Sequence, residues 1–268
     1  MKQRMIDLLR ADKDTEDYAG AVFGEFGLSV DKHYDLLVVA PAWKPTRIME
    51  SYDVEISCTA EHAYLSGYEV KYADRLIAWI QCSPGASSLI DELSLCAVLD
   101  FDKLVFVGAV GALVPDISLG ELCTPSWCVE GNLANGYLEE DILSYKPFGK
   151  VFPNDPAFVA RVAELVREMG FAMRQEPVFC TDSIYCEYAH MDFILRFGAR
   201  LIEMETSSFY RLADLMEKPA IALMAVSDNT STGNSLLVRS EAQRDAYNQC
   251  RMQRIPRIIL EIARRKEL

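Results

Sequence analysis

The sequence is poor in histidine and in basic residues, and each shortage excludes a class of function. Only three histidines occur among 268 residues, and their spacing forms no metal-ligand motif. Lys and Arg number 27 against 40 Asp and Glu, which gives a formal net charge of −13 at pH 7. Nucleic-acid binding relies on cations that neutralise phosphates, so we expect no nucleic-acid partner.

Long apolar runs are also lacking. The continuous apolar segments are short, whereas a membrane-crossing helix needs about 20 apolar residues. The N-terminal residues lead into the charged stretch Asp12-Lys13-Asp14, which is unlike the apolar region of a secretory signal. We therefore expect a soluble, cytoplasmic protein that needs no membrane partner.

The eight cysteines form no Cys-x-x-Cys pair. The closest spacings join Cys123 with Cys128 and Cys180 with Cys186, each near an apolar run. A free cysteine in such a run behaves as a small core residue. We expect buried, reduced thiols, no metal site, and three histidines that are exposed or half-buried.

Apolar runs alternate with amphipathic segments along the chain, without repeats or low-complexity linkers. Continuous apolar runs predict buried strands, and a 3.6-residue periodicity predicts helices. Strands that are apolar throughout need cover on both faces of their sheet. The predicted strands are 36–40, 76–80, 103–107, 201–204 and 220–226, and the predicted helices are 86–99, one capped by Asn154 that ends before Gly170, 206–217 and 241–266. The basic cluster 254–266 fits the solvated face of the last helix.

In such folds, ligands bind beyond the carboxyl ends of strands. The first candidate segment, Gly108-Ala109-Val110-Gly111, follows a predicted strand in this way. Glycine has no Cβ, so the backbone can approach a ligand closely there. The segment lacks the third glycine and following helix of a dinucleotide fingerprint. Such glycine turns are also common where nothing binds.

The second candidate, Glu203-Met204-Glu205, places two carboxylates at the end of an apolar run. In a strand, both glutamates would point to one face, where a fixed carboxylate suits the adjacent hydroxyls of a sugar. If a helix begins here, Glu205 would instead lie in its first turn, where the helix dipole favours an anion. This segment alone favours the second explanation.

The third candidate is Asp228 in the predicted turn Val226-Ser227-Asp228-Asn229. An aspartate in a turn usually bonds its own backbone. A catalytic aspartic acid would have to keep its proton at neutral pH, and partial burial raises a carboxyl pKa by the required roughly 2–3 units.

The three segments occur in this order, each after a predicted strand, and the combination resembles the purine nucleoside phosphorylase and uridine phosphorylase family. The same superfamily includes the methylthioadenosine nucleosidases. The likeness extends from about Leu36 to the last helix. It implies a three-layer α/β/α fold around a mixed sheet, in one domain over residues 1–268 with a variable N-terminal segment at 1–34. It also implies a homodimer or hexamer and no metal or organic cofactor.

The resemblance implies a role for each residue at the two ends of a nucleoside. Glu205 would accept hydrogen bonds from the ribose hydroxyls, with Met204 and Glu203 beside the sugar. Asp228 would donate a proton to the purine ring, and Arg239 would assist it. Glycosidic cleavage leaves negative charge on the base, and a general acid there typically contributes a factor of ~10²–10⁴. The base itself would contact Ile184, Tyr185, Gly111 and Val110.

The family's phosphate site is only partly matched. Of the family's Gly-Asp-Pro-x-Arg turn, this sequence keeps only the arginine, Arg47, with Lys44 nearby. The family's other phosphate contacts would fall at and beside Gly108 and Ala109. Phe106 and Ala109 replace an arginine and a hydroxyl residue, and neither side chain can donate a hydrogen bond.

Three hypotheses for the function follow from the incomplete match to the phosphate site. Phosphate could bind through Arg47, Lys44, backbone N–H groups and Ser87 or Ser88. Water could replace phosphate, as in the nucleosidases. The protein could also bind a nucleoside without turning it over. We predict ribosyl transfer from a purine-type nucleoside to inorganic phosphate, a co-substrate, with hydrolysis and non-catalytic binding as the alternatives.

Overall fold

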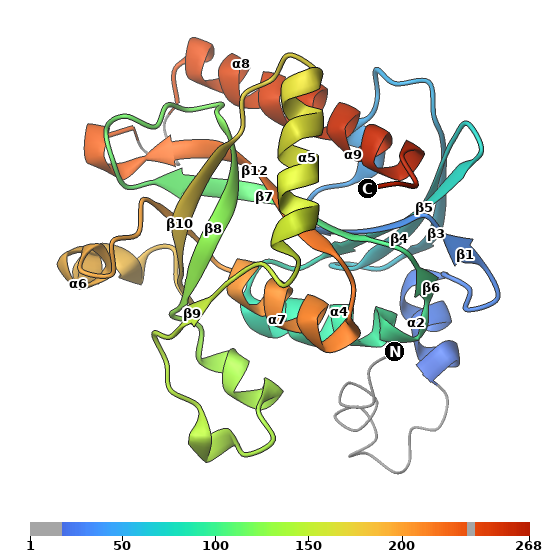
Figure 1. Cartoon of the computed structure of the whole chain (residues 1–268), viewed down its shortest axis with the longest axis horizontal. Coiled ribbons are helices and arrows are strands. Elements are labelled where there is room, and N and C mark those ends of the chain that lie inside the picture. The colour runs from blue at the N-terminus through green and yellow to red at the C-terminus, as the bar shows by residue number, and fades with distance from the viewer. Residues whose placement is uncertain (1–17, 235–238) are drawn as a thin grey trace.

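A mixed β-sheet with helices on both faces forms the centre of the molecule (Figure 1). The computed structural model describes residues 18–234 and 239–268. The first half of the predicted variable N-terminal segment, residues 1–17, lies outside the described residues. The layered arrangement confirms the predicted three-layer α/β/α fold with a mixed sheet.

Ten strands make the main sheet, in the order β11-β10-β8-β12-β7-β2-β5-β4-β3 with β9 beside β8. The end strand β11 also pairs antiparallel with β7, so five strands close on themselves around one end of the sheet. A separate pair joins β1 and β6. The strands are β1 His33–Tyr34, β2 Leu36–Pro41, β3 Glu55–Glu61, β4 Ser66–Tyr72, β5 Arg75–Cys82, β6 Asp100–Phe101, β7 Leu104–Ala112, β8 Leu122–Glu130, β9 Lys150–Val151, β10 Arg174–Cys180, β11 Leu201–Glu203 and β12 Ala220–Asn229.

The helices divide between the two faces of the sheet. Helices α2, α4 and α7 cover one face, and α3, α5, α8 and α9 cover the other (Figure 1). Their bounds are α2 Tyr18–Phe26, α3 Pro45–Ile48, α4 Ala86–Leu95, α5 Pro156–Glu168, α6 Met191–Leu195, α7 Thr206–Met216, α8 Glu241–Gln249 and α9 Ile255–Arg264. The π-helical turn η6, Cys250–Arg254, joins α8 to α9. Short 3₁₀ turns are η1 Cys96–Val98, η2 Leu133–Leu138, η3 Ile142–Ser144, η4 Cys186–His190 and η5 Thr230–Thr232.

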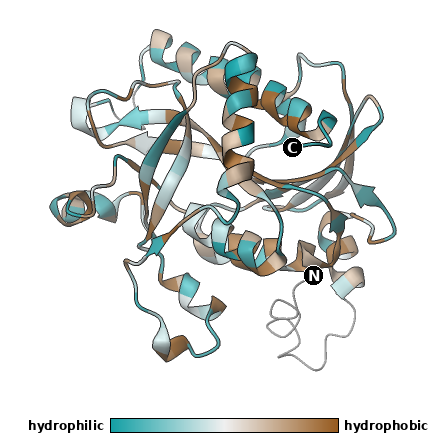
Figure 2. Ribbon diagram, viewed as in Figure 1, coloured by the Kyte–Doolittle hydropathy of each residue, from teal (hydrophilic) through white to brown (hydrophobic). Residues whose placement is uncertain are grey.

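The side chains of the central strands point alternately to the two faces of the sheet, so each strand contributes to both hydrophobic cores. In β2 every residue is buried, with Leu37 and Val39 in the core on the α4 side and Leu36 and Val38 in the core on the α9 side. A strand between two helical layers must be apolar on both faces, which explains its continuous apolar run. Figure 2 shows the apolar residues concentrated along these strands and on the inner sides of the helices.

The five predicted strands are present, and four of them run further than predicted, β7 and β12 by the most. β7 continues to Ala112 and β12 to Asn229, because the two pair in parallel as far as Asn229 opposite Ala112. The segments predicted as turns at Gly108–Gly111 and Val226–Asn229 are therefore strand, and that part of the prediction was wrong. Glycine and aspartate have the backbone N–H and C=O groups that strand pairing requires, so neither residue type prevents a strand from continuing.

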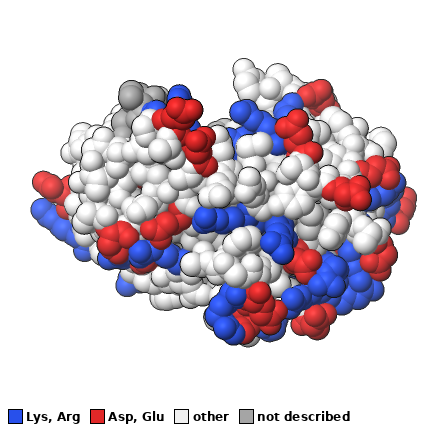
Figure 3. Space-filling model, turned by 90° about the horizontal axis from the view of Figure 1, so that it is seen from above, with Lys and Arg blue, Asp and Glu red and all other residues white. Residues whose placement is uncertain are grey.

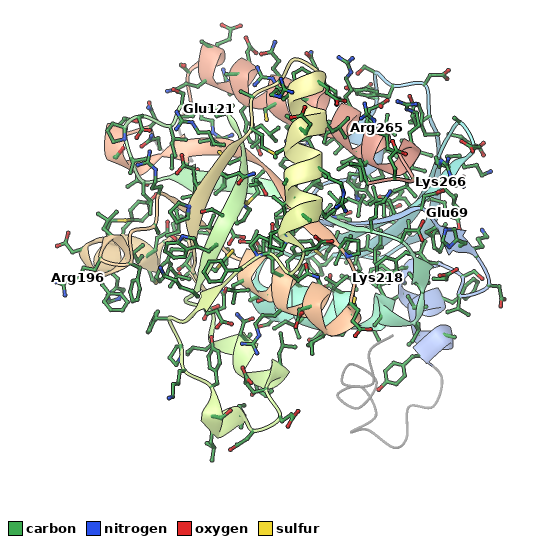
Figure 4. The ribbon with its side chains drawn as sticks, viewed as in Figure 1. Glu69, Glu121, Arg196, Lys218, Arg265 and Lys266 are labelled. Atoms are coloured by element: carbon green, nitrogen blue, oxygen red, sulfur yellow. The ribbon has the colours of Figure 1, made fainter. Side chains whose placement is uncertain are left out.

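The predicted helices are present with different ends. The first stops at Leu95 and continues as a 3₁₀ turn, and the last is interrupted by the π-helical turn. The apolar side of α9 enters the core, while Arg264 pairs with Glu261 and Arg265 with Glu168. The basic cluster is thus a solvated face, as predicted. Figure 3 shows Lys and Arg mixed with Asp and Glu on the upper face, and Figure 4 shows Arg265 and Lys266 at the end of α9.

The cap of α5 is Asp155, not Asn154 as predicted. Asp155 Oδ1 accepts a hydrogen bond from the Phe158 N–H at 2.8 Å, and Pro156 takes the first helical position. Proline there fixes the start of the helix one residue later than the sequence suggested. Asn154 instead donates to the carbonyl of Lys218 at 2.8 Å. Gly170 follows the helix with φ +78°, as expected.

All eight cysteines are free, and six are buried. Cys58, on the outer strand β3, and Cys186, on a surface turn, are exposed, so the prediction of buried thiols was wrong for these two. The histidines are all exposed as expected, although His62 follows β3 and does not lie in a helix-like stretch. No helix among the described residues is long and apolar enough to cross a membrane.

The cap of α5 gives a stability prediction. Asp155→Ala removes the acceptor for an N-terminal N–H of α5 and should lower the free energy of unfolding by about 0.5–2 kcal/mol. Asp155→Asn keeps a capping oxygen and should retain most of that stability. Urea unfolding followed by circular dichroism measures both, and equal losses in the two variants would contradict the capping role.

Candidate active site

A cavity of about 230 Å³ opens at the carboxyl ends of β2, β7, β11 and β12. Its wall includes most of the residues that the sequence singled out. The predicted residues that line it are Gly108, Ala109, Val110, Gly111, Ile184, Glu203, Met204, Glu205 and Asp228. Segments that lie up to about 180 residues apart along the chain meet here because their strands share one edge of the sheet.

A β-bulge aims Asp228 into the cavity. Val226 pairs with Val110 and Asp228 with the next residue, Gly111, so Ser227 is an extra residue on β12. A Cβ on Gly111 would lie 3.1 Å from Asp228 Oδ2, so glycine leaves the space that this carboxyl occupies. The Asp228 carboxyl group thus packs directly against the backbone of β7 at Gly111.

Asp228 is 8% exposed, and its Oδ1 accepts a hydrogen bond from the Ser227 hydroxyl at 2.5 Å. Burial raises the pKa of Asp228, while this hydrogen bond and the positive charge of Arg239 oppose the rise. A raised pKa increases the fraction of the carboxyl that carries a proton near neutral pH.

Glu203 secures the start of α7. Its Oε2 accepts from the backbone N–H groups of Glu205 at 2.7 Å and Thr206 at 2.8 Å. Its Oε1 accepts from the Thr206 hydroxyl and the Cys180 thiol, both at 2.8 Å. Both oxygens are therefore engaged by protein donors, although the side chain borders the cavity. This is the helix-start role that the sequence had suggested for Glu205.

Glu205 precedes α7 and lines the cavity. Its Oε1 accepts from the Gly85 N–H at 2.5 Å, and Gly85 has φ +108°, which favours glycine. Burial and then the charge of Glu203 raise the pKa of Glu205. Burial also raises the pKa of Glu203, against its four donors. Since those donors favour a charged acceptor, Glu203 is the better site for the negative charge and Glu205 for a proton.

Glu187 is a cavity residue that the sequence did not reveal. It lies on η4, three residues after Ile184, and is buried beside the cavity. Burial and the charge of Asp228 raise the pKa of Glu187 to about 7. The only sequence signal was its nearness to the predicted base segment, because a single glutamate in a polar stretch has no distinctive pattern.

Aromatic side chains form the remaining wall. Trp43, Phe106 and Tyr188 line the cavity together with Pro84. Phe106 packs against Phe209 of α7, and a Cβ on Gly108 would meet the Phe106 ring at 2.9 Å. The ring therefore lies over the bare backbone of β7, and the cavity wall there is apolar.

Four predicted site residues do not line the cavity. Tyr185 is 70% exposed and does not line the cavity, whereas Tyr188 on η4 does. Lys44 pairs with Glu61 at 2.6 Å. Arg47 is exposed on α3. Arg239 lies outside the wall, close enough for its charge to lower the pKa of Asp228 against burial.

One cluster has metal-ligand spacing, with ligand atoms of His33, Asp35 and Asp102 within 4.8 Å of one another. Its members already have protein partners. His33 contacts Asp100 at 2.9 Å and Asp102 at 3.4 Å, and Asp35 pairs with Arg75 at 2.9 Å. The cluster is better explained as an ion-pair network between β1, β6 and β5.

The phosphorylase superfamily matches this sequence over residues 41–261, a range that includes every cavity residue. The chain belongs to the phosphorylase superfamily. A purine nucleoside phosphorylase of the DeoD type from Geobacillus stearothermophilus is 30% identical over 169 residues, 62% of this chain and 67% of that protein. The Bacillus subtilis protein of the same type is 24% identical over 190 residues, 69% of this chain and 78% of that protein.

Several solved structures share the fold. A 5′-methylthioadenosine/S-adenosyl homocysteine nucleosidase from Campylobacter jejuni has a TM-score of 0.66 at 19% identity, covering 85% of this chain and 98% of that chain. A uridine phosphorylase from Vibrio fischeri has a TM-score of 0.67 at 16% identity, covering 87% and 91%. The futalosine hydrolase of Helicobacter pylori has a TM-score of 0.67 at 14% identity, covering 86% and 97%.

Replacement by glutamine should change the free energy of unfolding in opposite directions at Glu203 and Glu205. The pKa of Glu205 is raised in the folded state, so folded protein holds this proton more tightly than unfolded protein does. Stability from this group is complete below its ordinary pKa of 4.5 and is lost as pH rises toward the raised value. Glu205→Gln removes that loss and should stabilise the protein by about 1–3 kcal/mol at pH 8, with little effect at pH 4.5.

Glu203→Gln replaces an acceptor oxygen with a donor group among four donors and should destabilise by about 1–3 kcal/mol at pH 8. Urea unfolding at both pH values measures the two variants. Destabilisation of both variants by equal amounts at pH 8 would contradict the division of charge between Glu203 and Glu205.

Proposed function

We propose that the protein cleaves the N-glycosidic bond of a purine-type nucleoside and transfers the ribosyl group to phosphate. The DeoD-type purine nucleoside phosphorylases among its relatives support this substrate and this acceptor. The observation that carries the proposal is the pairing of Asp228 with Glu205 in one cavity, each with a raised pKa.

Asp228 acts on the leaving base. As the bond breaks, the base gains negative charge, and a protonated Asp228 neutralises it by donating to a ring nitrogen. The aspartate left behind is anionic, and the nearby positive charge of Arg239 stabilises it. Val110, Gly111 and Ile184 provide the apolar surface on which the base rests.

Glu205 and Met204 act on the sugar. Glu205 accepts hydrogen bonds from ribose hydroxyls, which favour its ionised form and lower its pKa on binding. The sugar becomes positively charged in the transition state, so the adjacent Glu205–Glu203 pair stabilises it more than the ground state. Glu203 contributes charge and holds the start of α7, because its oxygens are already engaged.

Hydrolysis is the second candidate, and the charge of the cavity favours it. Among the described residues, the cavity lining includes the four carboxyl groups of Glu187, Glu203, Glu205 and Asp228, and no Lys, Arg or His. Water enters such a wall at lower electrostatic cost than a phosphate dianion does. The nucleosidase of Campylobacter jejuni and the futalosine hydrolase of Helicobacter pylori share this fold.

A nucleoside panel separates these activities. The protein is incubated with purine nucleosides with and without phosphate, and free base and ribose 1-phosphate are measured. Base release that requires phosphate supports the transferase, and equal release without phosphate supports the hydrolase. Binding without release of base under either condition would contradict both.

Asp228→Asn should slow cleavage of a purine nucleoside by a factor of ~10²–10⁴ while the ligand still binds, because the amide cannot supply the proton. Glu205→Gln should mainly raise KM by weakening recognition of the sugar. Steady-state kinetics measure both, with Asp192→Asn on the exposed helix α6 as a matched control. Unchanged kinetics in Asp228→Asn would show that another group is the acid.

We also propose that residues 1–268 work as one domain and that the protein assembles into a homodimer or larger homo-oligomer. Eleven of the thirteen exposed large hydrophobic side chains among the described residues fall within 133–152 and 184–195. An exposed apolar patch of this kind is typical of an interface. Ile184 and Tyr188 also line the cavity, so a second subunit on this patch would cover its mouth. The cytoplasmic location stays a prediction.

Leu143, 90% exposed within this patch, gives a test of the assembly. Leu143→Asp should shift the protein from oligomer to monomer, because a charge in an apolar interface is desolvated without a partner. Light scattering coupled to size-exclusion chromatography measures the mass. Tyr64→Asp, at an exposed hydrophobic outside the patch, is the control. An oligomer unaffected by Leu143→Asp would place the interface elsewhere.

A further inference from the structure

The cavity receives two of its segments from the ends of neighbouring strands. Strand β10 lies beside β8 (Figure 1) and pairs along its other edge with β11. The pairing of β10 with β11 ends where Cys180 stands opposite Glu203. Beyond this pair the chain leaves β10 toward Ile184 and leaves β11 toward Met204, and both of these residues line the cavity. Strand pairing therefore stops just before the residues that contact the base and the sugar in the proposed function.

A buried asparagine connects the two segments beyond the strand ends. Asn132 follows β8 by two residues and is 0% exposed. Its Nδ2 donates to the Thr181 carbonyl at 3.0 Å, to Asp182 Oδ1 at 3.0 Å and to the Met204 carbonyl at 3.2 Å. One side-chain amide from β8 thus reaches past the end of β10 to the residue that follows β11. We call these three hydrogen bonds the Asn132 bridge.

The partners of Asn132 fix which way its amide group points. The three partners of Nδ2 are two carbonyls and a carboxylate, which only accept hydrogen bonds, so the nitrogen must face them. Oδ1 accepts from the hydroxyl of Ser207, in the first turn of α7, at 3.0 Å. That hydroxyl in turn accepts from Asn135 Nδ2 at 3.0 Å, which leaves its own hydrogen for Asn132. Both ends of the amide are therefore bonded in one orientation.

The segment that leads to the base is held at Asp182 by two donors. Asp182 Oδ1 accepts from Asn132, and Oδ2 accepts from the Leu133 N–H at 3.1 Å. Asp182 itself is exposed and lies two residues before Ile184. The turn that carries Ile184 thus begins at a point fixed to the residues after β8. The same amide holds the Met204 carbonyl, so the two segments share one reference point.

We propose that Asn132 is a positioning residue, which sets the distance between the base-contacting Ile184 and the sugar-contacting Met204. The inference rests on the proposed function, because a base and a sugar joined by the bond to be cleaved must both be held in register. Asn132 does not line the cavity, so it acts through the two segments that it joins. Misplacement of reacting groups by about 1 Å can lower a rate by ~10²-fold.

Hydrogen exchange of the free full-length protein, measured by mass spectrometry, tests the bridge without any ligand. Asn132→Ala removes the donor to both carbonyls, and exchange at 182–187 and 204–207 should accelerate together by about tenfold. Asn135→Ala is the matched control, because it removes another side-chain amide that is 0% exposed. The Asn135 side chain bonds to β8 and α7 instead, so its variant should leave exchange at 182–187 unchanged.

Asp182→Ala breaks the bridge from its exposed side. This variant should fold even if Asn132→Ala does not, because the Asp182 side chain is exposed. Exchange at 182–187 should accelerate as in Asn132→Ala. Asp155→Ala is its control, because it too removes a carboxylate that accepts from a backbone N–H, but at the start of α5.

Steady-state kinetics with adenosine test what the bridge does for the reaction. Asn132→Ala and Asp182→Ala should lower kcat ~10–100-fold at equal concentrations of folded protein, because base and sugar are no longer held in register. The pH at which kcat is half-maximal should stay in place, since the bridge does not contact Asp228. Asn135→Ala should keep the kcat of wild type. A purely structural role for Asn132 would leave kcat per folded molecule unchanged.

Binding measurements separate the bridge from the proposed function. If wild type binds adenosine without cleaving it, calorimetry should show that both bridge variants lose affinity for adenosine and keep their affinity for adenine. Exchange as expected in a wild type that neither cleaves nor binds adenosine would support the bridge and contradict the proposed function. Unchanged exchange in Asn132→Ala and Asp182→Ala would overturn the bridge. Accelerated exchange with kcat and adenosine affinity equal to those of wild type would overturn the positioning role.

Discussion

The hydrogen bonds of Glu203 are the constraint on which the sugar side of the site depends. One carboxylate at the end of β11 receives the first N–H groups of α7 and the thiol of Cys180 on β10. It thereby fixes where the strand stops and the helix starts, and Glu205 is left facing the cavity. A helix start always has unpaired N–H groups, and here a buried carboxylate of the preceding strand satisfies two of them. The Glu-Met-Glu segment therefore has a structural glutamate and a ligand-facing one.

The base side depends on a second backbone feature, the pairing of β12 with β7. Parallel pairing continues past the apolar part of both strands, and the bulge at Ser227 shifts the register so that Asp228 lies opposite Gly111. Because glycine has no side chain, the aspartate is buried against bare backbone, and this burial raises its pKa. The length of the strands, the bulge at Ser227 and the absence of a side chain at Gly111 thus together bury the Asp228 carboxyl group and raise its pKa.

Charge is divided between the interior of the cavity and its edge. The wall is acidic, which suits a sugar that becomes cationic, whereas Arg239 and Arg251 lie outside the wall, over the rings of Tyr247 and Trp43. The proposed chemistry at the glycosidic bond therefore takes place among acidic groups, with positive charge outside the wall. In this phosphorylase superfamily member β7 carries Phe106 and Ala109, and the described part of the cavity wall lacks positive charge. The nearby guanidinium groups lie outside that wall.

The sequence by itself determined the apolar strands, the three-layer fold and the segments that carry Asp228 and Glu205, because continuous apolar runs and local motifs are written in consecutive residues. It did not reveal β3, β4, β8 or β10, which lack a continuous aliphatic run, or the length of β7, whose glycines resembled a turn. Only the tertiary structure brought Glu187 and Tyr188 to the cavity wall and left Tyr185 exposed outside it. Trp43 and Arg251 stand about 200 residues apart, and no local pattern records a contact between residues so distant along the chain.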